Sequence, residues 1–159
     1  MGIPCPEPGD LVTDGTRLGI RYVRVENKRS YSRMLSDEPE RTEELSRELA
    51  RVCRHLHCTE CAGETFERVE LRYLSMLDSL DLPEDEKTAL RSFIGSVPAA
   101  DTALHGDFHM GNVVSTLPEG AGLEENHEVK FIDLDRFCCG NPLWDLGAIR
   151  RVCLDIPDD

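Results

Sequence analysis

The chain has 159 residues, enough for one compact domain, and its 40% hydrophobic and 31% charged residues are typical of a globular protein and not of a disordered one. Its formal net charge of −13 makes nucleic acid and anionic lipid poor partners, because phosphates repel an acidic surface. No apolar run has the length of a membrane helix, and the first ten residues lack the pattern of a signal peptide, so we expect a cytoplasmic protein without a membrane partner.

Residues 1–30 read as strands. Asp14-Gly15 is a hairpin signal between LVT and RLGIRYVRV, and residues 26–28 mark the end of the second strand. A two-stranded ribbon is only marginally stable alone, so we expect it to be the remainder of a larger sheet whose other part lies upstream.

The middle of the chain reads as three helices with apolar residues at helical spacing. The first begins at Pro39, the second runs from about Glu64 to Leu80, and the third begins near Pro83. Acidic residues follow the first and third starts, where they favour a helix N-terminus. We interpret the apolar stripes as core.

The first helix ends in HLHCTEC, which contains the residue types of a zinc site. A structural zinc normally takes two separated ligand pairs, whereas here a single C-x-x-C follows the helix. Packing at the helix end is therefore favoured over zinc, and the role of His55, His57, Cys58 and Cys61 stays open. Seven cysteines without an export signal favour reduced thiols over a disulfide framework.

After Pro98 the chain turns to short strands, ALH, NVVS and EVKFID, the last two separated by a polar turn. A final helix starts at Asn141-Pro142 and continues to Leu154. The whole sequence therefore predicts an α+β protein.

The segment HGDFHMGN contains His105, Asp107 and Asn112. Phosphoryl transfer needs a carboxylate that accepts or orients the acceptor hydroxyl, and an oxygen ligand that holds magnesium on the phosphates. The kinase catalytic loop has the same spacing of five residues between its Asp and Asn.

Asp133 follows Asn112 by 21 residues and ends the apolar run VKFID. A hairpin between this run and NVVS would bring Asn112 and Asp133 together, and magnesium prefers such oxygen ligands. The alternative is a surface acid at a strand end.

Asp145 lies in GNPLWDLG, in the first turns of the last helix. An acid there favours the helix N-terminus and can accept hydrogen bonds from backbone N–H groups of a neighbouring loop. Such a residue would stiffen a catalytic loop without taking part in the chemistry.

LHGDFHMGNVV, FIDLDRFCCG and NPLWDLG, in this order, resemble the C-terminal lobe of the aminoglycoside phosphotransferase and choline kinase-like family, which shares the protein-kinase fold. The segment GIPCPEPGDLVTDGTRLGIRYVRVENKRS resembles the end of the small lobe and the hinge of bacterial members. The resemblance implies a small-lobe remnant with the hinge at residues 1–30 and a mainly helical kinase-like C-terminal lobe with a short catalytic-loop hairpin at residues 31–159.

The same resemblance implies ATP and Mg²⁺ as cofactors and a small-molecule hydroxyl acceptor, such as an aminoglycoside or choline-like compound. It implies Asp107 as the catalytic base and Asn112 and Asp133 as metal ligands. Asp145 would brace the loop and His105 would orient its backbone. The strand leading into the adenine-binding hinge would contain Tyr22, Val23, Arg24 and Val25.

Two neighbours of these motifs stay open. Asp135 lies two residues beyond Asp133 and either joins the metal site or faces solvent, and we favour solvent because the strand ends there. His109 either contacts the acceptor or packs inside the loop.

The sequence departs from the family pattern in its first part. No Gly-rich strand turn and no following lysine precede Gly15, and the chain stops soon after DLG, so it reads as truncated. One alternative is therefore a non-catalytic C-terminal lobe that acts as a binding module or remnant. Another is a metal-dependent hydrolase using His105, His109, Asp107 and Asp133. The exposed edge of an incomplete small lobe can also pair with a second copy.

Overall fold

The computed structural model describes residues 2–153, which combine helices and short strands as the α+β prediction requires. They divide into two compact units. Of the described residues, unit 1 consists of 53–109 and 134–153, and unit 2 of Gly2–Val52 and Met110–Asp133. The division into residues 1–30 and 31–159 stays a prediction. No helix among the described residues is long and apolar enough to cross a membrane.

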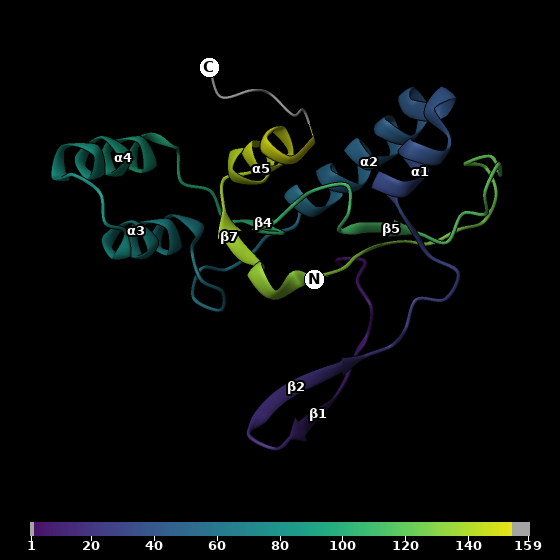
Figure 1. Ribbon diagram of the computed structural model, residues 1–159, viewed down its shortest axis with the longest axis horizontal. Helices are drawn as coiled ribbons and strands as arrows, with labels where there is room; N and C mark the ends of the chain where they lie inside the picture. Colours follow the sequence, from purple (N-terminus) through teal and green to yellow (C-terminus); the bar gives the residue numbers. More distant parts are fainter. Residues whose placement is uncertain (1, 154–159) are drawn as a thin grey trace. The chain divides into compact units, whose positions relative to one another are not determined.

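Unit 2 begins with an antiparallel hairpin of β1 (Pro8–Asp14) and β2 (Arg17–Tyr22), as predicted from Asp14-Gly15 (Figure 1). Asp14 pairs with Arg17, and Gly15 makes the turn with φ of +59°. The second strand ends at Tyr22, three residues before Val25. After the Val23 N–H donates to the Glu7 carbonyl (3.0 Å), the chain leaves the pairing.

The hairpin predicted between NVVS and EVKFID is part of a three-stranded antiparallel sheet in the order β3-β5-β6. Its strands are β3 (Arg29–Ser30), β5 (Val113–Ser115) and β6 (Val129–Phe131). The pairing of β5 with β6 was predicted. The added strand β3 was not, because two residues are too short to show periodicity.

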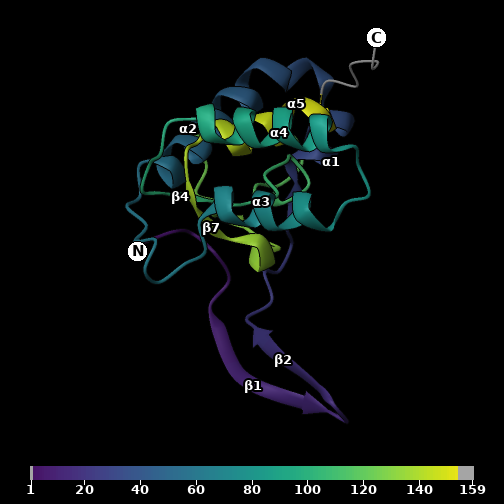
Figure 2. The same cartoon turned by 90° about the vertical axis from the view of Figure 1, so that its left-hand side faces the viewer.

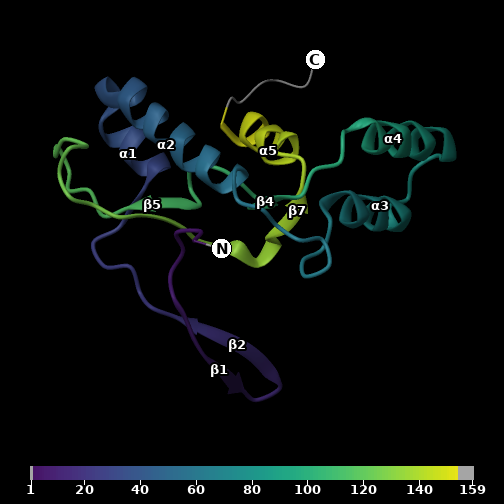
Figure 3. The same ribbon diagram turned by 180° about the vertical axis from the view of Figure 1, so that it is seen from behind.

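Three helical segments follow β3 in the chain, namely α1 (Tyr31–Asp37), a 3₁₀ turn η1 (Pro39–Arg41) and α2 (Thr42–His57) (Figure 3). The predicted helix start at Pro39 is confirmed. The preceding α1 was not predicted, although Ser30 is its N-cap and its hydroxyl accepts a hydrogen bond from the Arg33 N–H (3.3 Å). The buried core residues of this unit include Tyr31, Met34, Leu45, Val113, Val114, Leu117 and Phe131.

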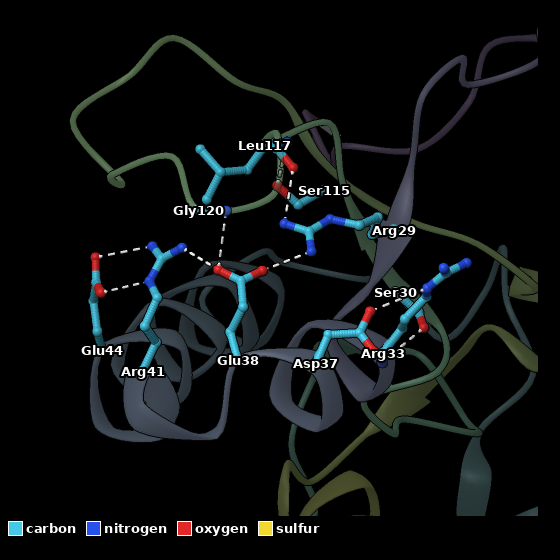
Figure 4. A network of polar contacts seen from close by, with 10 residues as sticks. All are labelled: Arg29, Ser30, Arg33, Asp37, Glu38, Arg41, Glu44, Ser115, Leu117 and Gly120. Atoms are coloured by element: carbon cyan, nitrogen blue, oxygen red, sulfur yellow. Dashed lines mark hydrogen bonds and ion pairs between the residues drawn. The ribbon is translucent and has the colours of Figure 1, made fainter.

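A buried ion-pair network ties unit 2 together at Glu38, between α1 and η1 (Figure 4). Its carboxylate accepts from the guanidinium groups of Arg29 and Arg41, each at 2.6 Å, and from the Gly120 N–H at 3.3 Å. Arg29 also donates to the Leu117 carbonyl at 3.3 Å. The network therefore fastens the first part of the loop between β5 and β6 to the helical segments.

Unit 1 contains α3 (Val69–Ser79) and α4 (Glu84–Ser96), which lie side by side (Figure 2). The third predicted helix is confirmed, but the second begins at Val69 and not at Glu64. Arg68 has an extended backbone and forms a β-bridge with Cys139, so the residues before Val69 are used for pairing with a strand.

The remaining elements of unit 1 are β4 (Thr102–Leu104), a 3₁₀ turn η2 (Leu134–Arg136), β7 (Cys138–Gly140) and α5 (Leu143–Cys153). β4 and β7 pair antiparallel, and β7 was not predicted. Val69, Leu104 and Cys138 form a buried cluster, against which Tyr73 and Trp144 pack. The predicted end of the last helix, Leu154, lies outside the described residues.

The expectation of reduced thiols was wrong for two cysteines, whereas four others among the described residues are free. Cys61 and Cys139 form a disulfide that joins the segment after α2 to β7, with Cα atoms 5.6 Å apart. The sequence could not reveal this pairing, because 78 residues separate the two cysteines and only the fold brings them together.

Candidate functional site

In unit 1 the predicted catalytic loop is held by Asp145, which lies in the first turn of α5. The Asp145 carboxylate is 1% exposed. Its Oδ2 accepts a hydrogen bond from the His105 N–H at 2.9 Å, and its Oδ1 accepts one from the Gly106 N–H at 2.9 Å. The two oxygens thus fix two consecutive peptide groups directly before Asp107. The role of Asp145 as the brace of a catalytic loop stays a prediction.

A third contact to Asp145 comes from His57, at the end of α2. The His57 Nε2 lies 2.9 Å from Asp145 Oδ2, and because a carboxylate only accepts, Nε2 donates. The Cys53 thiol lies 3.6 Å from His57 Nδ1. Burial, reinforced by the nearby Asp145 charge, raises the pKa of the Cys53 thiol to about 12, so this thiol stays protonated beside the His57 ring.

His57 therefore belongs to the support of the candidate loop. The sequence placed it in the HLHCTEC cluster, for which zinc was the less favoured interpretation. The structure gives two members of that cluster other partners, since His57 contacts Asp145 and Cys61 is bonded to Cys139. No spacing in the sequence indicates a contact across 88 residues, so this role could not be predicted.

Gly106 is required by its surroundings. Its φ is +81°, in the left-handed region, and a Cβ atom at this position would lie 2.0 Å from the Arg136 carbonyl oxygen. Arg72 Nη1 donates to the same carbonyl at 2.6 Å, and Arg72 Nε donates to the Glu67 carboxylate at 2.7 Å. The loop is thus packed against the Arg136 carbonyl in η2, and Arg72 of α3 holds this carbonyl in place. The sequence analysis identified neither Gly106 nor Arg72.

The other loop residues differ in burial. His105 is fully buried, and its ring meets the buried ring of Phe108 edge to face at 6.1 Å. Phe108 also contacts His57 at 6.4 Å between ring centroids. Asp107 and His109 are half-buried. Phe108 therefore anchors the loop, while Asp107 stays accessible.

Asp107 lines a cleft of about 590 Å³ in unit 1. One wall is aromatic, with Tyr73 and Trp144 at 4.8 Å and Phe93 and Trp144 at 6.3 Å between ring centroids. Arg136 also lines this cleft. A second cleft of about 430 Å³ shares Gly106 and Arg136 with the first, and Asp135 lines it. Asp135 is exposed, as the solvent-facing interpretation expects.

In unit 2 the two predicted metal ligands lie opposite each other at the base of the β5–β6 hairpin. The Ile132 N–H donates to the Asn112 carbonyl at 2.9 Å, so Asn112 lies opposite Ile132, and Asp133 is the next residue along the chain. Asn112 is buried and Asp133 is exposed. Asp133 has φ of +61°, a conformation that costs a non-glycine residue energy and that occurs preferentially at functional sites. The amide and carboxylate oxygens are a donor set suited to magnesium.

The residues predicted to lead into the hinge continue from the end of β2. Tyr22, Val23 and Arg24 are exposed, and Arg24 pairs with Glu26 at 3.4 Å. Val25 is partly buried. Their contact with a nucleotide stays a prediction.

Comparison with known proteins identifies the protein family of the chain. All 159 residues match the phosphotransferase enzyme family (APH), so the chain belongs to this family. The structure is similar to that of a choline/ethanolamine kinase family protein from Mesorhizobium loti, with 18% sequence identity and a TM-score of 0.47. That match covers 92% of this chain and 49% of the other, so the chain spans about half of that protein. No curated protein matches the sequence.

Proposed function

We propose that the chain is the kinase-like C-terminal lobe, with the small-lobe end and hinge at its start, of a phosphotransferase that moves the γ-phosphoryl group of ATP to a hydroxyl of a small molecule. The observation that carries the proposal is the Asp145 carboxylate on the His105 and Gly106 N–H groups. It fixes the backbone before Asp107 and leaves that carboxylate accessible at a cleft. Family membership supplies the reaction type.

In this proposal Asp107 accepts the proton of the acceptor hydroxyl as the new bond to phosphorus forms. Asn112 and Asp133 would hold magnesium, which when bound supplies positive charge to the phosphate oxygens. Asp145, supported by His57, holds the loop in one geometry, because catalysis of this kind depends on positioning. His109, half-buried two residues from Asp107, is a candidate for acceptor contact.

The cleft at Asp107 supports an acceptor that carries a positive charge. Asp107 and the aromatic side chains of Tyr73, Phe93 and Trp144 line the cleft together with Arg136. The carboxylate and the aromatic rings can attract an organic ammonium group by ionic and cation–π interaction. We therefore propose an amino alcohol or an aminoglycoside as the acceptor. A cytoplasmic location and pairing of a second copy through the β1–β2 edge stay predictions.

Phosphoryl transfer tests the proposal. The purified protein is incubated with γ-labelled ATP and a panel of aminoglycosides, choline and ethanolamine, with and without magnesium, and the labelled products are separated. We expect labelled acceptor only with magnesium. Transfer that does not need a divalent cation would overturn the assigned mechanism. Magnesium-dependent ATP binding without transfer to any acceptor would favour the non-catalytic alternative.

The metal-dependent hydrolase is less well supported. Among residues 2–153 no group of three or more His, Cys, Asp or Glu side chains lies in an arrangement that could hold a metal ion. A hydrolytic metal needs such a protein ligand set, whereas magnesium in a kinase is held largely by phosphate oxygens and water. Hydrolysis of a model ester in the same assay, with zinc or manganese added, would reverse this preference.

A further inference from the structure

The loop between β5 and β6 carries a histidine whose two ring nitrogens both face acceptors. His127 Nδ1 lies 2.8 Å from the Glu125 carbonyl oxygen, and Nε2 lies 2.8 Å from Glu48 Oε1 on α2. A neutral imidazole has one N–H and can donate to only one of them. The imidazolium donates to both, so the observed contacts are complete only when His127 is protonated.

The partner of His127 is itself held in place. The second oxygen of Glu48 accepts a hydrogen bond from the hydroxyl of Tyr31, a fully buried residue of α1. The side chains of Glu48 and His127 are only 14% and 9% exposed, so the ion pair is shielded from solvent more than a surface pair.

The groups that face this contact set its titration. Glu48 is the charged group from α2, Tyr31 is the titratable group from α1, and the loop itself contributes the Glu125 carbonyl. Burial and the contact with Glu48 raise the pKa of Tyr31, which therefore stays a neutral donor. Burial of the His127 ring opposes its charge, but the hydrogen bond to Glu125 and the ion pair with Glu48 outweigh it and raise the pKa of His127.

We propose that His127 and Glu48 form a pH-sensitive latch that fastens the β5–β6 loop to α2 when the imidazole is protonated and releases it as the pH rises. The latch acts on the hairpin whose base carries Asn112 and Asp133. It does not depend on the phosphotransferase assignment, because it rests on contacts within unit 2.

The direction of the pH dependence follows from the linkage between protonation and folding. The folded-state pKa of His127 is above its unfolded value of about 6.5. The latch therefore contributes fully below about pH 6.5, and its contribution is lost as the pH rises through the higher folded pKa.

The other end of the loop provides an internal control. There the Glu38 carboxylate accepts from the Gly120 N–H and Arg29 donates to the Leu117 carbonyl (Figure 4), and neither contact involves an imidazole. Between the two ends, the Leu123 N–H donates to the carboxylate of Glu44 on α2. The loop therefore has several attachments without an imidazole and one, through His127, that depends on pH.

The test combines NMR titration of His127 with hydrogen exchange of the loop amides from pH 6 to 9, corrected for the intrinsic pH dependence of exchange. In the wild type we expect His127 to titrate above its ordinary value. Protection of residues 121–128 should fall with rising pH, about tenfold for each pKa unit by which the His127 titration is raised. Residues 117–120 should keep their protection.

Two variants make the result specific. In His127→Gln the loop protection should no longer change with pH, and in Glu48→Gln the His127 titration should move down. Near-UV circular dichroism reports whether each variant is folded. If a variant is not folded, the NMR titration of His127 in the wild type tests the latch. A His127 that titrates at or below its ordinary value, or loop protection with the same pH dependence in His127→Gln, would overturn the latch.

Discussion

Replacing Asp145 with alanine removes the acceptor for the buried His105 N–H, for the partly buried Gly106 N–H and for His57 Nε2. Each buried donor left without a partner costs about 1–3 kcal/mol. Because three donors lose their acceptor and relaxation or water recovers part of the loss, we expect Asp145→Ala to lower the free energy of unfolding by about 3–5 kcal/mol.

The matched variants test the origin of this loss. Asp145→Asn keeps one acceptor oxygen but turns a donor toward the other N–H, so it should cost about half as much as alanine. Asp135→Ala removes an exposed acid from the neighbouring η2 and should change the stability by less than about 0.5 kcal/mol.

Urea unfolding measures these differences. The fluorescence of Trp144, the single tryptophan of the chain, reports on unfolding directly beside Asp145. The reasoning is refuted if Asp145→Ala lowers the stability by less than about 1 kcal/mol, or if it lowers it no more than Asp135→Ala does.

Three further predictions concern stability. Gly106→Ala should lower the free energy of unfolding by about 2–4 kcal/mol, because its Cβ would lie 2.0 Å from a carbonyl oxygen of η2. The control is Gly95→Ala in α4, where nothing lies within 4 Å of the added Cβ. In the same urea assay this variant should be more stable by up to about 1 kcal/mol. Reduction of the Cys61–Cys139 disulfide, which spans 78 residues, should cost about 4 kcal/mol, and a Cys61→Ser variant should not respond to the reductant. Glu38→Gln should cost about 2–4 kcal/mol at pH 7. Burial opposes the charge of Glu38, but hydrogen bonds from its two arginine partners lower its pKa, so its contribution is present above the unfolded value and lost as the pH falls through the folded one. The variant should therefore show a shallower loss of stability in acid than the wild type, and equal acid limbs would contradict the assignment.

The sequence predicted the features that local pattern controls. The hairpin at Asp14-Gly15, the helix starts at Pro39 and Pro83 and the pairing of β5 with β6 each follow from turn residues or periodicity within a short window. The proximity of Asn112 to the end of β6 followed from that pairing.

The features that escaped prediction depend on contacts between distant segments. His57 reaches Asp145 across 88 residues, and Cys61 reaches Cys139 across 78. His127, which the sequence analysis treated as part of a solvated turn, contacts Glu48 across 79 residues. Such contacts leave no periodic or spacing signal in a single sequence, because tertiary packing alone creates them.

The central claim is that Asp107 accepts the proton of the hydroxyl to which phosphate is transferred. The most direct measurement compares the magnesium-dependent transfer rates of the wild type, Asp107→Asn and Asp135→Asn with an acceptor found in the panel. The account predicts that Asp107→Asn lowers kcat by about 10²- to 10⁴-fold, the contribution typical of a general base, while Asp135→Asn stays close to the wild type. An Asp107→Asn variant with unchanged kcat would contradict it.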